Sequence, residues 1–405
     1  MSQKNKRRIV KPKPPILLIS LAIAMSFLAL VQNKYGQFSD IKGFFQMHFI
    51  DGAHQWPFST YTPIGTTNEI HAVEYPAITG IIMWLISFLI PQANLAWLHY
   101  YWVTATFHIL LFAVSAYAVK SLANKKIAYA YVLAPAVLYS LYRNWDIWAI
   151  VPMLFAVIYF EEAKYRKSAV LLALSIATKF FPLVLLLPIA IQFLRKREIP
   201  EFLRYLGVTA VTWLLINLPV ALVNFDGWAY FYQYSFHRGV GSGSFYEIFG
   251  KLGLSVNFSS LVFYGLNIGI FGLLTAFLLK TQEALTLAES AFLTLFAFIL
   301  FNKQYSMQYI IWLAPLAVVA ISKAHEKFSK KLIYSYVIWQ VCEIAFQFSF
   351  FQNILTDLNR TDAPTMIDIS GFSYGIISAM RYISALIFTF YIAKSLYQSK
   401  IEKSL

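Results

Sequence analysis

The chain is poor in charge and almost free of cysteine. Charged residues make up 13% of its 405 residues, against about 25% in an ordinary soluble domain, and apolar residues make up 59%. A surface this poor in charge cannot stay in water, so the composition excludes a soluble globular enzyme, a disordered tail and a DNA-binding module. The single cysteine, Cys342, excludes an internal disulfide. The composition therefore indicates a polytopic membrane protein.

Apolar runs separated by polar residues predict an all-α protein that forms a single membrane domain over residues 1–405. A straight crossing needs about 20 residues. Several runs are shorter, so their ends must be surrounded by protein rather than by lipid. The twelve predicted crossings are 15–33, 97–119, 127–142, 147–160, 169–178, 183–194, 205–223, 259–279, 284–302, 309–322, 332–351 and 373–393.

One further apolar run, residues 76–91, sets the orientation of every later helix. If this run is a re-entrant or interfacial helix that does not cross, the cytoplasmic segments hold 24 of the 33 Lys and Arg residues. If it crosses, 18 of those 24 fall outside. Basic residues favour the cytoplasmic side, so we expect a multi-pass protein with both termini in the cytoplasm. The first run lacks a small-residue cleavage site and is expected to remain as a membrane helix.

This topology collects the longer polar segments on one side. The cytoplasmic loops are short and basic, and the net charge of +14 is explained by these orientation signals rather than by a nucleic-acid partner. Any chemistry is therefore expected at the extracytoplasmic face of the cell membrane. The segments predicted to lie there are 34–75, 224–258 and 352–372, together with the turns 143–146, 179–182 and 302–308.

The first outer segment supplies a candidate general base. Asp40 follows the first crossing at short range, and a carboxylate held at the membrane surface can accept a proton from a substrate hydroxyl. The alternative is that Ser39 or Asp40 only caps an interfacial helix. Glu74 and Tyr75 stand where the chain enters the membrane again, and an acid at that place is costly unless it is paired or functional.

Two short turns supply further charges. Arg143 and Asp146 are three residues apart, so they can form a local ion pair or contribute to a site. Lys179 lies between two short apolar runs, and Pro182 breaks the helix after it. Its ammonium group either reaches back to the interface or meets an anion in a cavity, and we favour the phosphate of a lipid-linked substrate.

The remaining outer segments are rich in aromatic and hydrogen-bonding side chains, which suit a sugar. Candidate substrate contacts are His237 and Arg238 in the second large loop and Gln308 after the cation Lys303. The glycine-rich run 239–243 is interpreted as a flexible hinge, because no strand precedes it. His48, His54 and His71 lack close ligand spacing, so no metal site and no cofactor is expected.

Five short motifs follow one another along the chain: Ser39-Asp40-Ile41, Glu74-Tyr75-Pro76-Ala-Ile-Thr-Gly80, Asn144-Trp145-Asp146, Lys179-Phe-Phe-Pro182, and Asn302-Lys303 followed by Ser306-Met-Gln308-Tyr309 and Trp312-Leu-Ala-Pro315. In this order they resemble glycosyltransferase family 87, whose members are bacterial membrane mannosyl- and arabinofuranosyltransferases with the GT-C fold. The resemblance covers residues 14 to 320.

The resemblance implies a sugar transfer from a polyprenyl-phosphate donor to a glycolipid or glycan acceptor, with inversion at the anomeric carbon. It implies that Asp40 is the catalytic base. We expect Lys179, with Arg143 or Lys303, to neutralise the departing phosphate, and Glu74, Tyr75, Asp146, His237, Arg238 and Gln308 to contact the sugar or the acceptor. The alternatives are a transporter or lipid flippase and a non-catalytic scaffold, although a transporter would place its polar residues near the membrane midplane.

The predicted topology can be tested with single cysteines at Asn94 and Asn124. If residues 76–91 do not cross, a membrane-impermeant thiol reagent should label position 94 from outside and position 124 only from the cytoplasm. The opposite labelling pattern would overturn the topology and, with it, the outer location of every candidate site residue.

Overall fold

The computed structural model describes residues 15–33, 39–49, 54–60, 69–91, 94–124, 126–254, 260–281, 286–357 and 369–404. Among these residues 81% are helical and none form a strand, which confirms the all-α prediction for the described part of the chain. Of the first outer segment, residues 34–75, the structure describes 39–49, 54–60 and 69–75.

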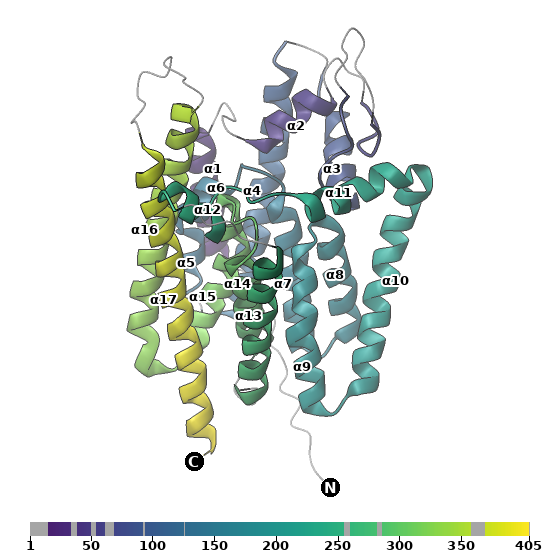
Figure 1. The fold of residues 1–405 in the computed structure, drawn as a ribbon. Helices are drawn as coiled ribbons and strands as arrows, with labels where there is room; N and C mark the ends of the chain where they lie inside the picture. The colour runs from purple at the N-terminus through teal and green to yellow at the C-terminus, as the bar shows by residue number, and fades with distance from the viewer. Residues whose placement is uncertain are drawn as a thin grey trace.

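The long helices stand side by side as a bundle, and α2 (Asp40–His48) and α11 (Phe225–His237) lie across its upper end in Figure 1. The turn between α9 and α10 and the C-terminal end of α17 lie at the opposite end (Figure 1). The helices of the bundle are α1 (Ile16–Gln32), α4 (Ala96–Leu122), α7 (Asp146–Glu161), α8 (Tyr165–Thr178), α9 (Leu186–Lys196), α10 (Ile199–Val223), α13 (Ser260–Thr281), α14 (Leu287–Leu300), α15 (Ile310–Lys323), α16 (Glu326–Asp357) and α17 (Gly371–Ser404). The other elements are α3 (Ala77–Ser87), α5 (Tyr129–Val132), α6 (Pro135–Ser140), the 3₁₀ turns η2 (Phe181–Leu185) and η3 (Met307–Tyr309), and α12 (Phe245–Lys251).

The centre of the bundle is formed by α14 and α15. Every residue of α15 from Ile310 to Ile321 is buried, and α14 is buried along almost its whole length. A helix that is apolar on all sides must lie inside a large protein or in lipid. By contrast, only 17% and 6% of the residues are buried in the most apolar 18-residue stretches of α10 and α13. Most of their apolar side chains therefore lie on the surface of the protein, as expected for helices that face lipid.

Four helices are long and apolar enough to cross a membrane, and four shorter ones are apolar. The long ones are Ala96–Leu122, Ile199–Val223, Leu261–Thr281 and Gly371–Ser399, and the shorter ones are Ile16–Gln32, Ala77–Ser87, Leu287–Leu300 and Met307–Lys323. All twelve predicted crossings fall on helical structure, with 127–142 divided into α5 and α6 at Pro135. The helices support a membrane protein, while the number of crossings stays a prediction.

Of residues 76–91, Ala77–Ser87 form the short helix α3. Its 11 residues span about 16 Å at the helical rise of 1.5 Å per residue, roughly half of a hydrocarbon core of about 30 Å. This length fits a re-entrant or interfacial helix.

The break predicted at Pro182 is present. The helix α8 ends at Thr178, Lys179 is extended with φ −144° and ψ 136°, and η2 follows. The hydroxyl of Thr79 in α3 donates to the carbonyl of Thr178 at 2.6 Å. This contact satisfies one of the carbonyls that a helix end leaves without an intrahelical partner, and so α3 stabilises the turn that carries Lys179.

Candidate functional site

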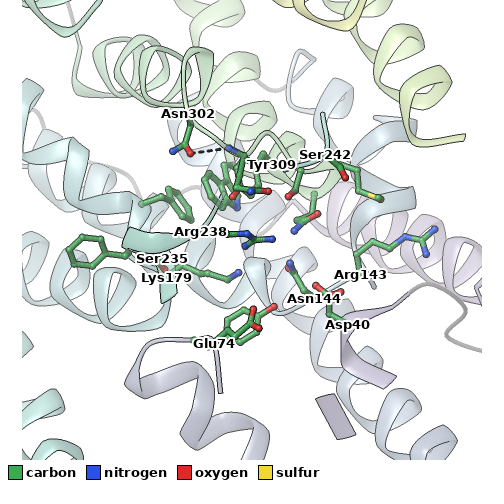
Figure 2. Close-up of a pocket in the computed structure, with 18 of the residues that line it drawn as sticks. Asp40, Glu74, Arg143, Asn144, Lys179, Ser235, Arg238, Ser242, Asn302 and Tyr309 are labelled. Atoms are coloured by element: carbon green, nitrogen blue, oxygen red, sulfur yellow. Dashed lines mark hydrogen bonds between the residues drawn. The ribbon is translucent and has the colours of Figure 1, made fainter. Parts of the chain in front are cut away.

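A cavity of about 510 Å³, here called the main cavity, collects side chains from nearly all of the segments predicted to lie outside. The first outer segment contributes Asp40, Glu74 and Tyr75, and the turns after α6 and α8 contribute Arg143, Asn144 and Lys179. Figure 2 shows Asp40, Glu74, Asn144 and Lys179 around Arg238, while the guanidinium group of Arg143 points away from it. The remaining wall comes from the loop between α11 and α12, from residues 302–309 and from the outer end of α16.

The start of α2 fixes the place of Asp40. Ser39 is the N-cap of α2 and accepts from the backbone N–H of Ile41, while its own hydroxyl donates to the carbonyl of Tyr142 at 2.7 Å. The backbone N–H of Asp40 donates to the carbonyl of Arg143 at 2.8 Å. The capping role therefore belongs to Ser39, and it leaves the side chain of Asp40 free to line the main cavity.

The carboxyl group of Asp40 has an unusual acidity for an aspartate. Its side chain is exposed to the main cavity, but the surrounding protein shields it from bulk water and raises its pKa to about 6. The ammonium group of Lys179 opposes this shift, whereas the carboxylates of Asp146 and Glu74 add to it. A carboxylate with a pKa near neutral pH is ionised and still basic enough to remove a proton.

Lys179 forms an ion pair with Asp146. Its Nζ lies 2.7 Å from Oδ1 of Asp146, whose side chain is 0% exposed, while the side chain of Lys179 is 14% exposed. The other carboxylate oxygen, Oδ2, accepts from the indole Nε1 of Trp312 at 3.0 Å. Asp146 also stands in the first turn of α7, where the helix dipole favours a negative charge. Asp146 therefore pairs with Lys179 and not with Arg143.

Three stacked rings form the apolar wall beside this ion pair. The ring of Trp312 lies 3.7 Å from the rings of both Phe181 and Tyr309, with interplanar angles of 8° and 20°. The ring of Tyr75 also receives the ammonium group of Lys179 at 4.4 Å. Aromatic faces with hydrogen-bonding neighbours suit the ring of a sugar, and they also exclude water from the Lys179–Asp146 pair.

Glu74 and Arg238 both line the main cavity and influence each other electrostatically. Burial raises the pKa of Glu74, and the hydroxyl of Tyr234 and the charge of Arg238 oppose that shift. Arg238 follows the last residue of α11, and its guanidinium group lies 5.5 Å from the ring of Tyr234. Contacts between the first outer segment and α11 continue at His71, whose ring stacks on Tyr230 at 5.4 Å.

The other predicted site residues have different placements. Arg143 lines the main cavity, with its guanidinium group between the rings of Tyr139 and Phe351 at 4.6 and 4.4 Å, and Gln308 lines the cavity too. Lys303 does not line it and instead lies over the ring of Phe263 at 5.0 Å.

His237 is likewise outside the lining, and its Nδ1 contacts the carbonyl of Gln233 at 2.8 Å. Within the described residues, no cluster of His, Cys, Asp or Glu could hold a metal ion.

Sequence reasoning missed a buried ion pair that holds one wall of the main cavity. Nε of Arg381 in α17 donates to Glu343 in α16 at 2.8 Å, and both side chains are 0% exposed. The same guanidinium group donates to the carbonyls of Tyr305 and Ser306 at 2.6 and 3.2 Å. Glu343 also accepts from the hydroxyl of Tyr305 and the indole of Trp339. One Glu and one Arg in two long apolar helices were the available signal, because such residues rarely lie in a membrane without a partner.

No family model matches the chain, and no curated protein sequence is similar to it.

The Glu343–Arg381 pair predicts a large loss of stability when one partner is removed. Arg381→Met should lower the free energy of unfolding by about 3–5 kcal/mol, because it leaves a carboxylate buried without its counter-charge. Glu343→Leu combined with Arg381→Met should recover most of this loss. Denaturant titration of the purified protein in detergent gives the measurement.

The matched control is Arg204→Met, which removes an exposed ion pair with Glu201 and should change the free energy by about 1 kcal/mol or less. A double variant as unstable as Arg381→Met alone would show that the two charges do not act as a unit.

Proposed function

We propose that the protein is a GT-C-like glycosyltransferase that moves a sugar from a polyprenyl-phosphate donor to a lipid or glycan acceptor at the extracytoplasmic face of the membrane. The proposal includes about twelve crossings and cytoplasmic termini. It is carried by one observation: the main cavity brings the carboxylate of Asp40 together with cationic and aromatic side chains from five separate segments. These segments are far apart in the sequence, and all of them except 224–258 carry motifs that resemble family 87.

The proposed reaction needs one general base. Asp40 takes the proton of the acceptor hydroxyl, and the acceptor oxygen forms a bond to the anomeric carbon of the donor sugar. The bond between that carbon and the phosphate oxygen breaks, and polyprenyl monophosphate leaves with the electron pair. The phosphate is a good leaving group and needs no proton, so no second acid is required. Displacement from the opposite face inverts the anomeric carbon.

The lining of the main cavity supports such a substrate. The guanidinium groups of Arg143 and Arg238 offset the charge of a phosphate. Neutral polar groups at Asn144, Ser306 and Gln308 can bind sugar hydroxyls. Phe180, which is 39% exposed, and Phe231 offer apolar surface at the edge of the cavity for a prenyl chain.

A transporter is supported less well. A transporter with alternating access has its polar substrate site near the membrane midplane, where each face of the membrane can reach it in turn. In the described residues the titratable groups of the main cavity come from the turns at one end of the bundle, and the centre is filled by the apolar helices α14 and α15.

The function can be tested with membranes that contain the protein. They should transfer label from polyprenyl-phosphate mannose or from polyprenyl-phosphate arabinose, supplied separately, to a lipid or glycan product. Membranes that carry Asp40→Asn are the matched control. Absence of product from both donors would contradict the proposal.

Asp40→Asn should lower turnover by roughly a hundred- to ten-thousand-fold, the usual contribution of general base catalysis. An amide has nearly the shape of a carboxylate and keeps the backbone contact to Arg143, but it cannot accept a proton at neutral pH. Expression and donor binding should stay close to those of the unchanged protein. Turnover and donor affinity are measured on the same purified sample.

The comparison variants are Glu74→Gln and Asp51→Asn; Asp51 lies outside the described residues. Near-normal turnover in Asp40→Asn, together with its loss in either comparison variant, would show that another carboxylate is the base. Full activity in all three would speak against glycosyl transfer itself.

The pH dependence should show the raised pKa of Asp40. The group is useful as a base only when it has lost its proton, so kcat/KM should fall tenfold per pH unit below about pH 6. An aspartate with its ordinary pKa would give this limb near pH 4. The residual activity of Asp40→Asn should lack the limb, and an unchanged limb in that variant would assign it to another group.

A further inference from the structure

The charge of Lys179 is already shared between two acids. Its ammonium group contacts Asp146 at 2.7 Å, and it also acts on Asp40, where it opposes the rise of the pKa. The contact with Asp146 is protected from water, since that carboxylate is fully buried. Asp146 occupies one of the three N–H donors of this ammonium group and compensates its charge. A phosphate that drew Lys179 away would leave Asp146 as an uncompensated buried charge, at a cost of several kcal/mol. Lys179 therefore attracts a phosphate less strongly than a cation without an ion-pair partner.

Arg238 has the opposite properties. Its side chain is exposed and reaches into the main cavity between Lys179 and Asn144 (Figure 2). Among the described residues it forms no ion pair, and Glu74 influences it only through space. A guanidinium group offers two parallel N–H donors that match the oxygens of a phosphate. The site therefore already contains a cation that a phosphate can approach without breaking an ion pair among the described residues.

A second cavity of about 280 Å³ lies beside Arg238, and no carboxylate lines it. It shares Arg238, Ser242, Gln304, Ser306 and Phe350 with the main cavity, and Gly239, Val240 and Gly241 complete its lining. The carboxylates of Asp40 and Glu74 line only the main cavity. Among the described residues, Arg238 thus borders a cavity whose carboxylates oppose a phosphate and a second cavity in which it is the one charged lining residue.

The other two cations are less suited to this role. The guanidinium group of Arg143 is buried between the rings of Tyr139 and Phe351, and Lys303 lies outside the main cavity over Phe263.

We propose that Arg238 binds the phosphate of the polyprenyl donor at the junction of the two cavities, while Lys179 stays paired with Asp146. The inference rests on the proposed function and specifies which residue contacts the leaving group. The phosphate then lies on the side of the second cavity, and the acceptor hydroxyl lies on the side of Asp40 and Glu74. The two substrates are separated by charge within one site.

The test measures binding of undecaprenyl monophosphate to the purified protein in phosphatidylcholine nanodiscs. Arg238→Gln should weaken binding by about ten- to a hundredfold, the usual effect of losing a charged hydrogen bond. The double variant Lys179→Met/Asp146→Asn removes the ion pair without changing the net charge, and it should bind within about threefold of the unchanged protein. Because Arg238 is exposed, its substitution should not affect folding, so the result for Arg238→Gln is decisive even if the double variant is unstable.

Lys303→Gln is the matched control, because it removes a cation of the same predicted outer face that does not line the main cavity. Undecaprenol, which lacks the phosphate, and inorganic phosphate as a competitor separate the contribution of the prenyl chain from that of the anion. Weakened binding in Arg238→Gln alone, with weak binding of undecaprenol, supports the inference.

Equal binding by Arg238→Gln and the unchanged protein would overturn the inference, and so would an equal loss in Lys303→Gln. A loss confined to the double variant would return the phosphate to Lys179, with the proposed function intact. If the unchanged protein binds no undecaprenyl monophosphate, the proposed function itself is contradicted.

Discussion

The site depends on the ion pair between Lys179 and Asp146. Asp146 begins α7, Lys179 ends α8, and Trp312 of α15 donates to the same carboxylate, so one contact joins three helices at the level of the main cavity. Its 2.7 Å length and the full burial of Asp146 make the pair costly to break from either side, because a single charge would remain in a region with little water. The stacked rings of Phe181, Trp312 and Tyr309 help to exclude water from this region. The Asp146 carboxylate holds the ammonium group of Lys179, whose charge lowers the pKa of Asp40. The charge of Asp146 itself adds to the rise of that pKa.

The same rule explains how short and broken helices persist in an apolar protein. A backbone or charged group away from water needs a partner within the chain. The carbonyl of Thr178 has Thr79, and the carbonyls of Tyr305 and Ser306 have Arg381. Two turns of the main cavity are thus held by helices from other parts of the sequence. Thr79 belongs to α3 and Arg381 to α17, and neither residue lines the cavity.

Much of the fold could be predicted because apolar runs and proline breaks are local signals. The runs fell on helices, and the break between Thr178 and Pro182 is where the proline placed it. The convergence of Asp40, Glu74, Lys179 and Arg238 could be expected only in outline, from the shared side of their segments. The partner of Asp146 could not be read from spacing: Arg143 is three residues away, but Lys179, 33 residues on, occupies the position that the crossing of α7 and α8 creates. The Glu343–Arg381 pair could not be predicted for the same reason, because two packed helices bring together residues whose separation in the sequence follows no regular spacing.

The distribution of charge within the main cavity fits the proposed reaction. In that reaction a base meets a neutral hydroxyl and a phosphate meets a cation, so the two proposed substrates favour opposite electrostatic potentials. Asp40 and Glu74 line the main cavity alone, whereas Arg238 also lines the second cavity, whose lining contains no carboxylate. Lys179 and Asp146 form a pair with no net charge. Removal of either partner would therefore change more than one contact, because it would leave a full charge close to Asp40, whose pKa both charges influence. The pairing lets the protein hold, in one small cavity, an acid of raised pKa and Arg238, a cation that forms no ion pair among the described residues.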